Sequence, residues 1–155
     1  MSAVLNEPEV LLRPMRAEDI DDVMKVELVA YPYPWTHGIF HDCLRVGYSC
    51  WLIEVAGSVA AYGVMSSAVG EAHILNICVD ESVRRRGFGK AMLEHLVNLA
   101  RQRDNEVCLL EVRPSNEAAI SMYHDYGFNE VGTRKNYYPD DKGREDALIL
   151  ALNLI

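Results

Sequence analysis

The sequence Arg84-Arg-Arg-Gly-Phe-Gly-Lys-Ala91 joins an apolar strand, predicted over residues 72–79, to the clearest helical pattern of the chain. The helix is expected over residues 87–103, because apolar side chains recur at the spacing of one helical face: Leu93, Leu96, Val97 and Ala100. Residues 106–112 then form a nearly continuous apolar strand, which is typical of a strand covered on both faces. Strand, helix and strand in this order predict a crossover within a mixed sheet.

The other elements follow from their own periodicity and end signals. Further strands are expected at residues 10–14, 49–56, 59–67, 128–134 and 147–154. Further helices are expected at residues 17–30, at 36–46 with Thr36 as N-cap, and at 115–126 with Ser115 as N-cap and Gly127 just past the end. The chain is therefore interpreted as one domain over residues 1–155, a mixed α/β (α+β) protein with helices on both faces of its sheet.

Composition limits the function classes. The 155 residues carry a net charge of −8, and this disfavours a nucleic-acid binder, which needs a basic surface. No apolar stretch approaches the roughly 20 residues that span a bilayer, and no signal peptide opens the chain, so a cytoplasmic protein that does not bind membranes is expected. The cysteines lack metal-ligand spacing and are expected to be buried free thiols: Cys43, Cys50, Cys78 and Cys108.

The glycine turn between the strand and the helix predicts an anion site. Gly87 and Gly89 allow a ligand to approach the backbone, and the unpaired amides at a helix start favour negative charge. Four cations gather there in an acidic protein: Arg84, Arg85, Arg86 and Lys90. Two commoner nucleotide-binding motifs are excluded. A P-loop would need Gly at position 84 and Ser or Thr at 91, where the chain has Arg84 and Ala91. A dinucleotide fingerprint would need Gly at 92, where the chain has Met92. A phosphate or pyrophosphate site is one interpretation, and a glycine turn with solvated arginines is the other.

The pattern R-x-x-G-x-G after a strand and at the start of a helix resembles the acetyl-coenzyme A motif of the GNAT acetyltransferases. The resemblance implies a three-layer fold whose mixed, mostly antiparallel sheet has about seven strands, and acetyl-CoA as co-substrate. In that family the turn holds the pyrophosphate and the preceding strand holds the pantetheine arm. The cofactor-binding residues it implies are Ile77, Cys78, Val79, Arg84, Arg85, Arg86, Gly87, Phe88, Gly89 and Lys90.

A carboxylate lies in the strand that follows the long helix. Side chains alternate along a strand, so Glu111 shares a face with Val107 and Leu109. A carboxylate on an apolar face is costly without partners, and we expect a raised pKa, which suits a general base. The alternative is a structural ion pair with Arg113 or with the cations at 84–86.

A tyrosine follows on the next helix. Tyr123 belongs to an apolar helical face, so a core role with a hydrogen-bonded hydroxyl is the simple interpretation. Acetylation offers chemical roles to both residues. A base must remove a proton from an α-amine, whose pKa is roughly 8, and a phenol of pKa about 10 can protonate the thiolate that leaves.

The segments ICVD, RRRGFGKA, LEVRPSNEAAISMY, YGFNEVGTRKNYYP and GREDALILAL are similar to the bacterial RimI enzymes, a GNAT subfamily. RimI proteins acetylate the N-terminal alanine of a small-subunit ribosomal protein. The resemblance therefore implies a protein N-terminal peptide as substrate. It also implies that Glu111 is the base, Tyr123 the acid, and Asn116 a cofactor-binding residue.

Two aromatic and proline-rich segments are candidate walls of a peptide groove. Loop residues 31–35 supply Tyr33 and Trp35, and a second segment, 136–139, supplies Tyr137 and Tyr138. The alternative is that these side chains only hold two loops against the core. A group of acidic residues could attract a basic substrate or could be a solvated face: Asp140, Asp141, Glu145 and Asp146.

Other functions remain open at this point. The same fold and cofactor site would serve an enzyme that acetylates a lysine side chain, a polyamine or a small-molecule amine, or a non-catalytic acyl-CoA binding module. A metal site is not expected, because His37 and His41 lack a third ligand at a recognisable spacing. His73, His95 and His124 are isolated in the sequence and are expected to be structural or exposed, and a monomer is expected.

Overall fold

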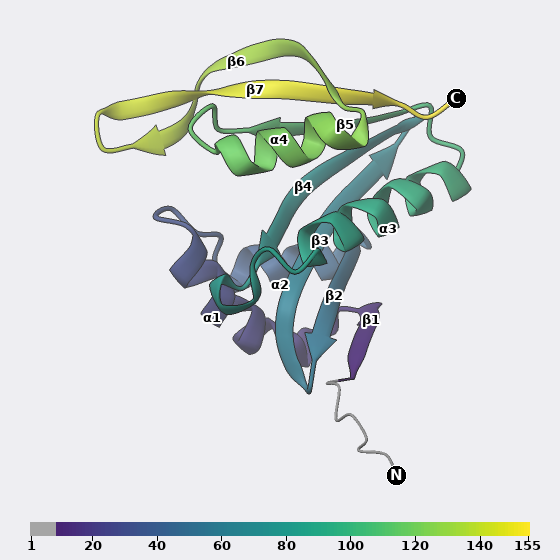
Figure 1. The fold of residues 1–155 in the computed structure, drawn as a ribbon, viewed down its shortest axis with the longest axis vertical. Helices are drawn as coiled ribbons and strands as arrows, with labels where there is room; N and C mark the ends of the chain where they lie inside the picture. Colours follow the sequence, from purple (N-terminus) through teal and green to yellow (C-terminus); the bar gives the residue numbers. More distant parts are fainter. Residues whose placement is uncertain (1–8) are drawn as a thin grey trace. The chain divides into compact units, whose positions relative to one another are not determined.

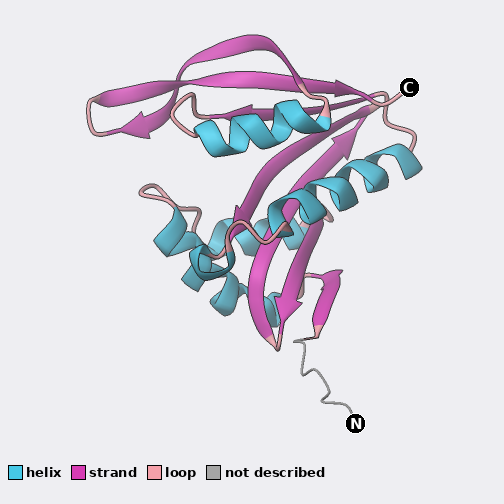
Figure 2. Ribbon diagram, viewed as in Figure 1, coloured by secondary structure: helices cyan, strands magenta, loops and turns pink. Residues whose placement is uncertain are grey.

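The computed structural model describes residues 9–155, which fold into two compact units. Within the described residues, the first unit comprises 9–64 and 76–92, and the second comprises 65–75 and 93–155. Residues 9–155 form one mixed sheet in the order β1-β2-β3-β4-β5-β7-β6 and four α-helices (Figures 1 and 2). This confirms the predicted seven-stranded, mostly antiparallel α/β architecture.

The strands are β1 (Val10–Pro14), β2 (Ser49–Val55), β3 (Ser58–Ala68), β4 (Glu71–Val79), β5 (Val107–Val112), β6 (Asn129–Asp140) and β7 (Gly143–Asn153). The α-helices are α1 (Ile20–Ala30), α2 (His37–Arg45), α3 (Phe88–Gln102) and α4 (Glu117–Tyr126). Short 3₁₀ turns lie at Ala17–Asp19 and Glu81–Val83. Among residues 9–155, no helix is long and apolar enough to cross a membrane.

The first unit contains α1, α2, β1 and β2, and α1 begins later than predicted. Residues 17–19 form a 3₁₀ turn, because the buried Asp19 accepts the Arg16 amide at 2.7 Å and is held by the Arg13 guanidinium. That guanidinium also binds Glu54 on β2. Thr36 caps α2 as predicted, since its hydroxyl oxygen accepts from the Ile39 amide.

A buried carboxylate connects several elements of the first unit. Glu27 on α1 is 1% exposed. Its oxygens accept hydrogen bonds from the Trp35 amide at 2.8 Å, the Tyr62 hydroxyl at 2.6 Å and the Asn76 side-chain amide at 3.1 Å. These donors come from the loop after α1, from β3 and from β4, so one side chain fixes the loop to two strands.

In the second unit, β5 is bordered by a parallel and an antiparallel neighbour. It pairs in parallel with β4, where His73 lies opposite Leu109, and antiparallel with β7, where Glu111 lies opposite Ile149. One face of β5 is buried, with Cys108, Leu110 and Val112 between 0% and 6% exposed. The four cysteines are free and buried, as predicted.

Two details of the second unit differ from the sequence analysis. The N-cap of α4 is Asn116, whose side-chain oxygen accepts from the Ala119 amide, while the Ser115 hydroxyl donates to Glu145 instead. The strands predicted at 128–134 and 147–154 are parts of a much longer β6–β7 hairpin (Figure 2), which turns at Asp140 opposite Gly143. Residues 136–139 are therefore strand and not loop. β6 lies at the edge of the sheet, so most of its side chains are exposed and it lacks the alternation that marks a strand.

Replacing the buried carboxylate should destabilise the protein. Glu27→Ala leaves one buried and two part-buried donors without their acceptor, and we expect it to lower the free energy of unfolding by about 3 kcal/mol. Urea denaturation followed by circular dichroism measures this. Glu94→Ala, at an exposed helical position, is the control and should change stability by less than about 0.5 kcal/mol. Equal stability of the two variants would contradict the proposed role of Glu27.

Candidate functional site

The glycine turn has a backbone suited to an anion. Arg85 and Gly87 adopt positive φ angles of 65° and 85°, and Gly87 has open space where a Cβ would stand. The first amides of α3, which starts at Phe88, have no partner within the helix by virtue of their position. Gly89 lies inside the helix, so the left-handed conformation belongs to Gly87 and not to both glycines.

The side chains of the turn leave this cradle accessible. All four of its cations are exposed: Arg84, Arg85, Arg86 and Lys90. The Arg86 guanidinium lies over the Phe88 ring at 5.6 Å. Exposed cations beside free helix-start amides fit a flexible, multiply charged ligand such as a pyrophosphate.

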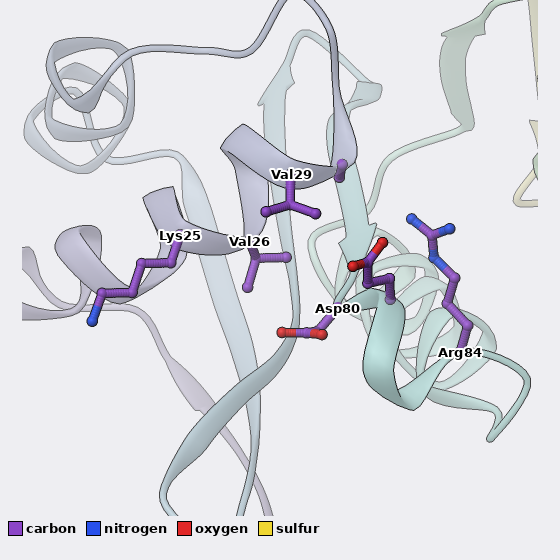
Figure 3. Close-up of a pocket in the computed structure, with 7 residues that line it drawn as sticks. Lys25, Val26, Val29, Asp80 and Arg84 are labelled. Carbon is purple, nitrogen blue, oxygen red and sulfur yellow. The ribbon is translucent and has the colours of Figure 1, made fainter.

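The predicted pantetheine strand is the last part of β4. The Ile77 carbonyl accepts a hydrogen bond from the Tyr31 hydroxyl at 3.1 Å, and Cys78 is buried, which raises the pKa of its thiol. Beyond the strand, Asp80 and Arg84 line a cavity of about 200 Å³ with Val26 and Val29 of α1 (Figure 3). The turn, the end of β4 and α1 thus come together within the first unit.

Glu111, in the second unit, has partners that the sequence analysis did not identify. Its Oε2 lies 2.7 Å from Nε2 of His73 on β4, and its Oε1 lies 3.7 Å from Nε of Arg134 on β6. The hydrogen bond to His73 outweighs the effect of burial and, with the charge of Arg134, lowers the pKa of Glu111. The expected raised pKa is therefore wrong, because a half-buried carboxylate with a donor and a cation is stabilised in its ionised form.

His73 is isolated in the sequence but not in the structure, where its imidazole contacts Glu111. Position 73 lies 38 residues from position 111, and only the parallel pairing of β4 with β5 brings the two side chains together. The sequence showed only that His73 lies in the strand that precedes the crossover helix. That information was too weak to single out His73.

Tyr123 on α4 is buried, and that burial raises the pKa of its phenol. Its ring packs edge-on against Phe128 at 5.8 Å. Within the described residues, no hydrogen bond joins Tyr123 to Glu111. Tyr123 is coupled electrostatically to Cys108, which alternation places on the face of β5 opposite Glu111, and to Tyr138. Asn116 uses its side-chain oxygen as the cap of the same helix.

Of the candidate peptide-binding aromatics, Tyr33 and Trp35 belong to the first unit. The Trp35 ring packs edge-on against the buried Phe40 at 5.2 Å, while its amide is held by Glu27. Tyr33 is 43% exposed. Trp35 therefore anchors the loop after α1, and Tyr33 presents an accessible ring next to that anchor.

Tyr137 and Tyr138 belong to the second unit, on an irregular part of β6. The pairing register shifts between Arg134 and Tyr138, and Asn136 has a φ of 54°. Tyr137 is 40% exposed and packs at 4.8 Å against Tyr138. Tyr138 lies under the Arg113 guanidinium at 4.4 Å, and burial raises the pKa of its phenol, to which the charge of Glu111 adds. Tyr138 is thus coupled to both Glu111 and Tyr123.

Most of the acidic group predicted as a substrate attractant has local structural roles. Glu145 pairs with Arg113 at 3.5 Å, Asp146 accepts from the Asn136 amide, and Asp140 accepts from the Lys142 amide. These contacts stabilise the β6–β7 hairpin. Among residues 9–155, no group of three side chains has the composition of a metal site.

Comparison with known proteins gives a consistent result. Residues 20–128 match the Acetyltransferase (GNAT) family. The chain is 38% identical over 138 residues to the [ribosomal protein bS18]-alanine N-acetyltransferase of Escherichia coli K12, covering 89% of this chain and 93% of that protein. The relative of the same name from Salmonella typhimurium is 37% identical over 134 residues, covering 86% and 90%.

Solved structures agree with the sequence comparison. The crystal structure of the ribosomal-protein-S18-alanine N-acetyltransferase from Escherichia coli superposes with a TM-score of 0.88 at 36% identity, covering 94% of each chain. The chain therefore belongs to the GNAT family of acetyltransferases, with RimI enzymes among its relatives. Enzymes of this family take their acetyl group from acetyl-CoA, and the turn at Gly87, with its free amides and exposed cations, fits the pyrophosphate of that molecule.

Changing the glycine of the turn should weaken cofactor binding. Gly87→Ala places a Cβ on a residue at φ 85°, which costs about 1–2 kcal/mol unless the turn relaxes and redirects its amides. We expect the Kd for CoA, measured by calorimetry, to rise about tenfold. Gly143→Ala, at φ 117° in the hairpin turn, carries similar strain and should leave the Kd unchanged. A rise of the same size in both variants would mean that general destabilisation is the cause.

Proposed function

We propose that this protein transfers the acetyl group of acetyl-CoA to the N-terminal α-amine of ribosomal protein bS18, at its alanine, with Glu111 as general base and Tyr123 as general acid. The observation that carries the proposal is the similarity to bS18-alanine N-acetyltransferases over nearly the whole of both chains.

The turn of the first unit orients the donor. Acetyl-CoA supplies the acetyl group as a thioester. Amides at the start of α3 bind the pyrophosphate, exposed Arg84, Arg85, Arg86 and Lys90 add charge, and the backbone of Ile77, Cys78 and Val79 binds the pantetheine arm. Asn116 is an additional cofactor-binding residue. Its capping bond uses only the side-chain oxygen, so the amide nitrogen is available as a donor.

Glu111 takes up the proton that the amine must lose. An α-ammonium has a pKa of roughly 8 and cannot attack a carbonyl carbon until it is deprotonated. The carboxylate of Glu111 is ionised at neutral pH, because its lowered pKa lies far below 7. It is 11% exposed, which allows proton transfer directly or through a water molecule.

Tyr123 protonates the sulfur that leaves. Burial raises the pKa of its phenol, so the hydroxyl keeps its proton at neutral pH and remains a donor. The exposed Tyr33 and Tyr137 and the anchored Trp35 and Tyr138 supply aromatic surface for an extended peptide. The net charge of −8 favours a basic peptide over nucleic acid, and a monomeric protein in the cytoplasm remains the prediction.

The base assignment predicts a loss of turnover without a loss of cofactor binding. Glu111→Gln keeps the shape of the side chain but cannot accept a proton, so we expect kcat to fall about 10²–10⁴-fold while the Kd for acetyl-CoA stays within about twofold. The assay follows thiol release with acetyl-CoA and an Ala-starting bS18 peptide. Glu106→Gln, an exposed neighbour just before β5, is the matched control and should retain full activity.

Mass spectrometry of the product identifies the acceptor amine. A single acetyl group on the N-terminal alanine supports the proposal. Acetylation only at lysine, or activity restricted to polyamines or small amines, would assign a different substrate to the same fold. CoA binding without turnover across a panel of N-terminal peptides would mean that the protein is a binding module.

A further inference from the structure

His73 contacts Glu111, and the acid–base mechanism of Glu111 and Tyr123 gives this histidine no role. His73 lies opposite Leu109 in the parallel pairing of β4 with β5, and Leu109 and Glu111 share a face by alternation. The imidazole and the carboxylate therefore project from one face of two adjacent strands. Their contact of 2.7 Å joins Nε2 to Oε2 and is short for an N–H···O bond, as charge-assisted hydrogen bonds are.

This geometry fixes which ring nitrogen can accept a proton. An ionised carboxylate only accepts hydrogen bonds, so Nε2 must carry the hydrogen that it donates to Glu111. The lone pair of a neutral His73 is then at Nδ1. The same arrangement, with a carboxylate on one ring nitrogen and the reacting proton on the other, orients the imidazole in Ser-His-Asp enzymes. The His73 side chain is 30% exposed against 11% for Glu111, so water has better access to the imidazole.

The acid–base strengths of the groups favour the imidazole as the final site of the proton. An ordinary carboxyl group lies about four pKa units below an α-ammonium, whereas an ordinary imidazole lies only about 1.5 units below it. The pKa of Glu111 is lowered further, which widens the gap for the carboxylate alone. The other groups around the pair are Arg134, 3.7 Å from Oε1, and the phenol of Tyr138, both on β6. On β7, the residue opposite Glu111 is the uncharged Ile149.

We propose that His73 and Glu111 act as one proton-accepting pair, in which the proton drawn from the substrate amine comes to rest on Nδ1 of His73. One N–H bond of the ammonium breaks and one N–H bond forms at Nδ1, by way of water, while the Nε2 hydrogen remains donated to Oε2. The charge of the pair changes from −1 to 0, and the partly exposed imidazole then returns the proton to solvent. This inference rests on the proposed function and refines the part of Glu111 in it: the carboxylate orients His73 and stabilises its protonated form, while the imidazole holds the proton.

The pH dependence of kcat at saturating acetyl-CoA and peptide tests the pair. In the wild type we expect kcat to rise with pH between about 5 and 8, the range in which histidines change charge, because the pair accepts a proton only after the imidazole has lost its own. His73→Gln keeps an N–H donor for Glu111 but cannot take up a proton. Its kcat should be about tenfold lower, and the acid limb should move below about pH 5, where a carboxylate titrates.

The exposed His124→Gln is the matched control and should keep the wild-type profile. An acid limb of His73→Gln at the same pH as in the wild type would overturn the inference, whether or not kcat is lower. A purely structural histidine would lower kcat without moving this limb.

A second measurement does not depend on turnover. Nitrogen-15 NMR of the histidine rings should show the Nε2–H tautomer for neutral His73. An Nδ1–H tautomer would overturn the pair. The proposed function instead fails if wild-type protein with an intact pair releases no thiol with any N-terminal peptide, so the two failures are distinguishable.

Discussion

The buried side chain of Glu27 is the interaction on which the first unit depends. A carboxylate that is almost completely buried needs hydrogen-bond donors for its oxygens. Its acceptors are satisfied by the Trp35 amide, the Tyr62 hydroxyl and the Asn76 amide. None of these donors can leave without exposing a buried charge to an apolar interior. The loop after α1 and the strand whose end carries Ile77, Cys78 and Val79 are therefore held to one helix by the same side chain.

Glu27 and Glu111 show how surroundings separate a structural carboxylate from a candidate catalytic one. Glu27 receives three donors and has almost no contact with solvent. Glu111 is held by His73 and by the more distant Arg134, and it keeps some exposure on a strand face. Both have partners, but only Glu111 has a titratable partner with its own access to water. The two residues are of the same type, and they differ in whether a proton can move between the carboxylate, its partner and water.

The sequence was sufficient for the fold wherever local signals and burial agree. The strand, glycine turn and helix over residues 72–103 were predictable, because an apolar strand, a helical period and Gly87 all point to the same structure. The long β6–β7 hairpin was not. Its outer strand lies at a sheet edge, exposes side chains on both faces and contains Pro139, which an edge tolerates. Capping at Asn116 instead of Ser115 depended on Glu145, which engages the serine from β7.

The candidate site was also only partly predictable from the sequence. Alternation along β5 was enough to place Glu111 on an apolar strand face, because that rule is local to one strand. The candidate role as base came from the resemblance to RimI enzymes. Its partner and the direction of its pKa shift required the register between β4 and β5, which brings residues 38 positions apart into contact. Tyr138, on β6, likewise interacts electrostatically with Glu111 and Tyr123 because of the fold and not because of its position in the sequence. Residue identity therefore gives the candidate acid and base, while strand register decides which side chains set their protonation.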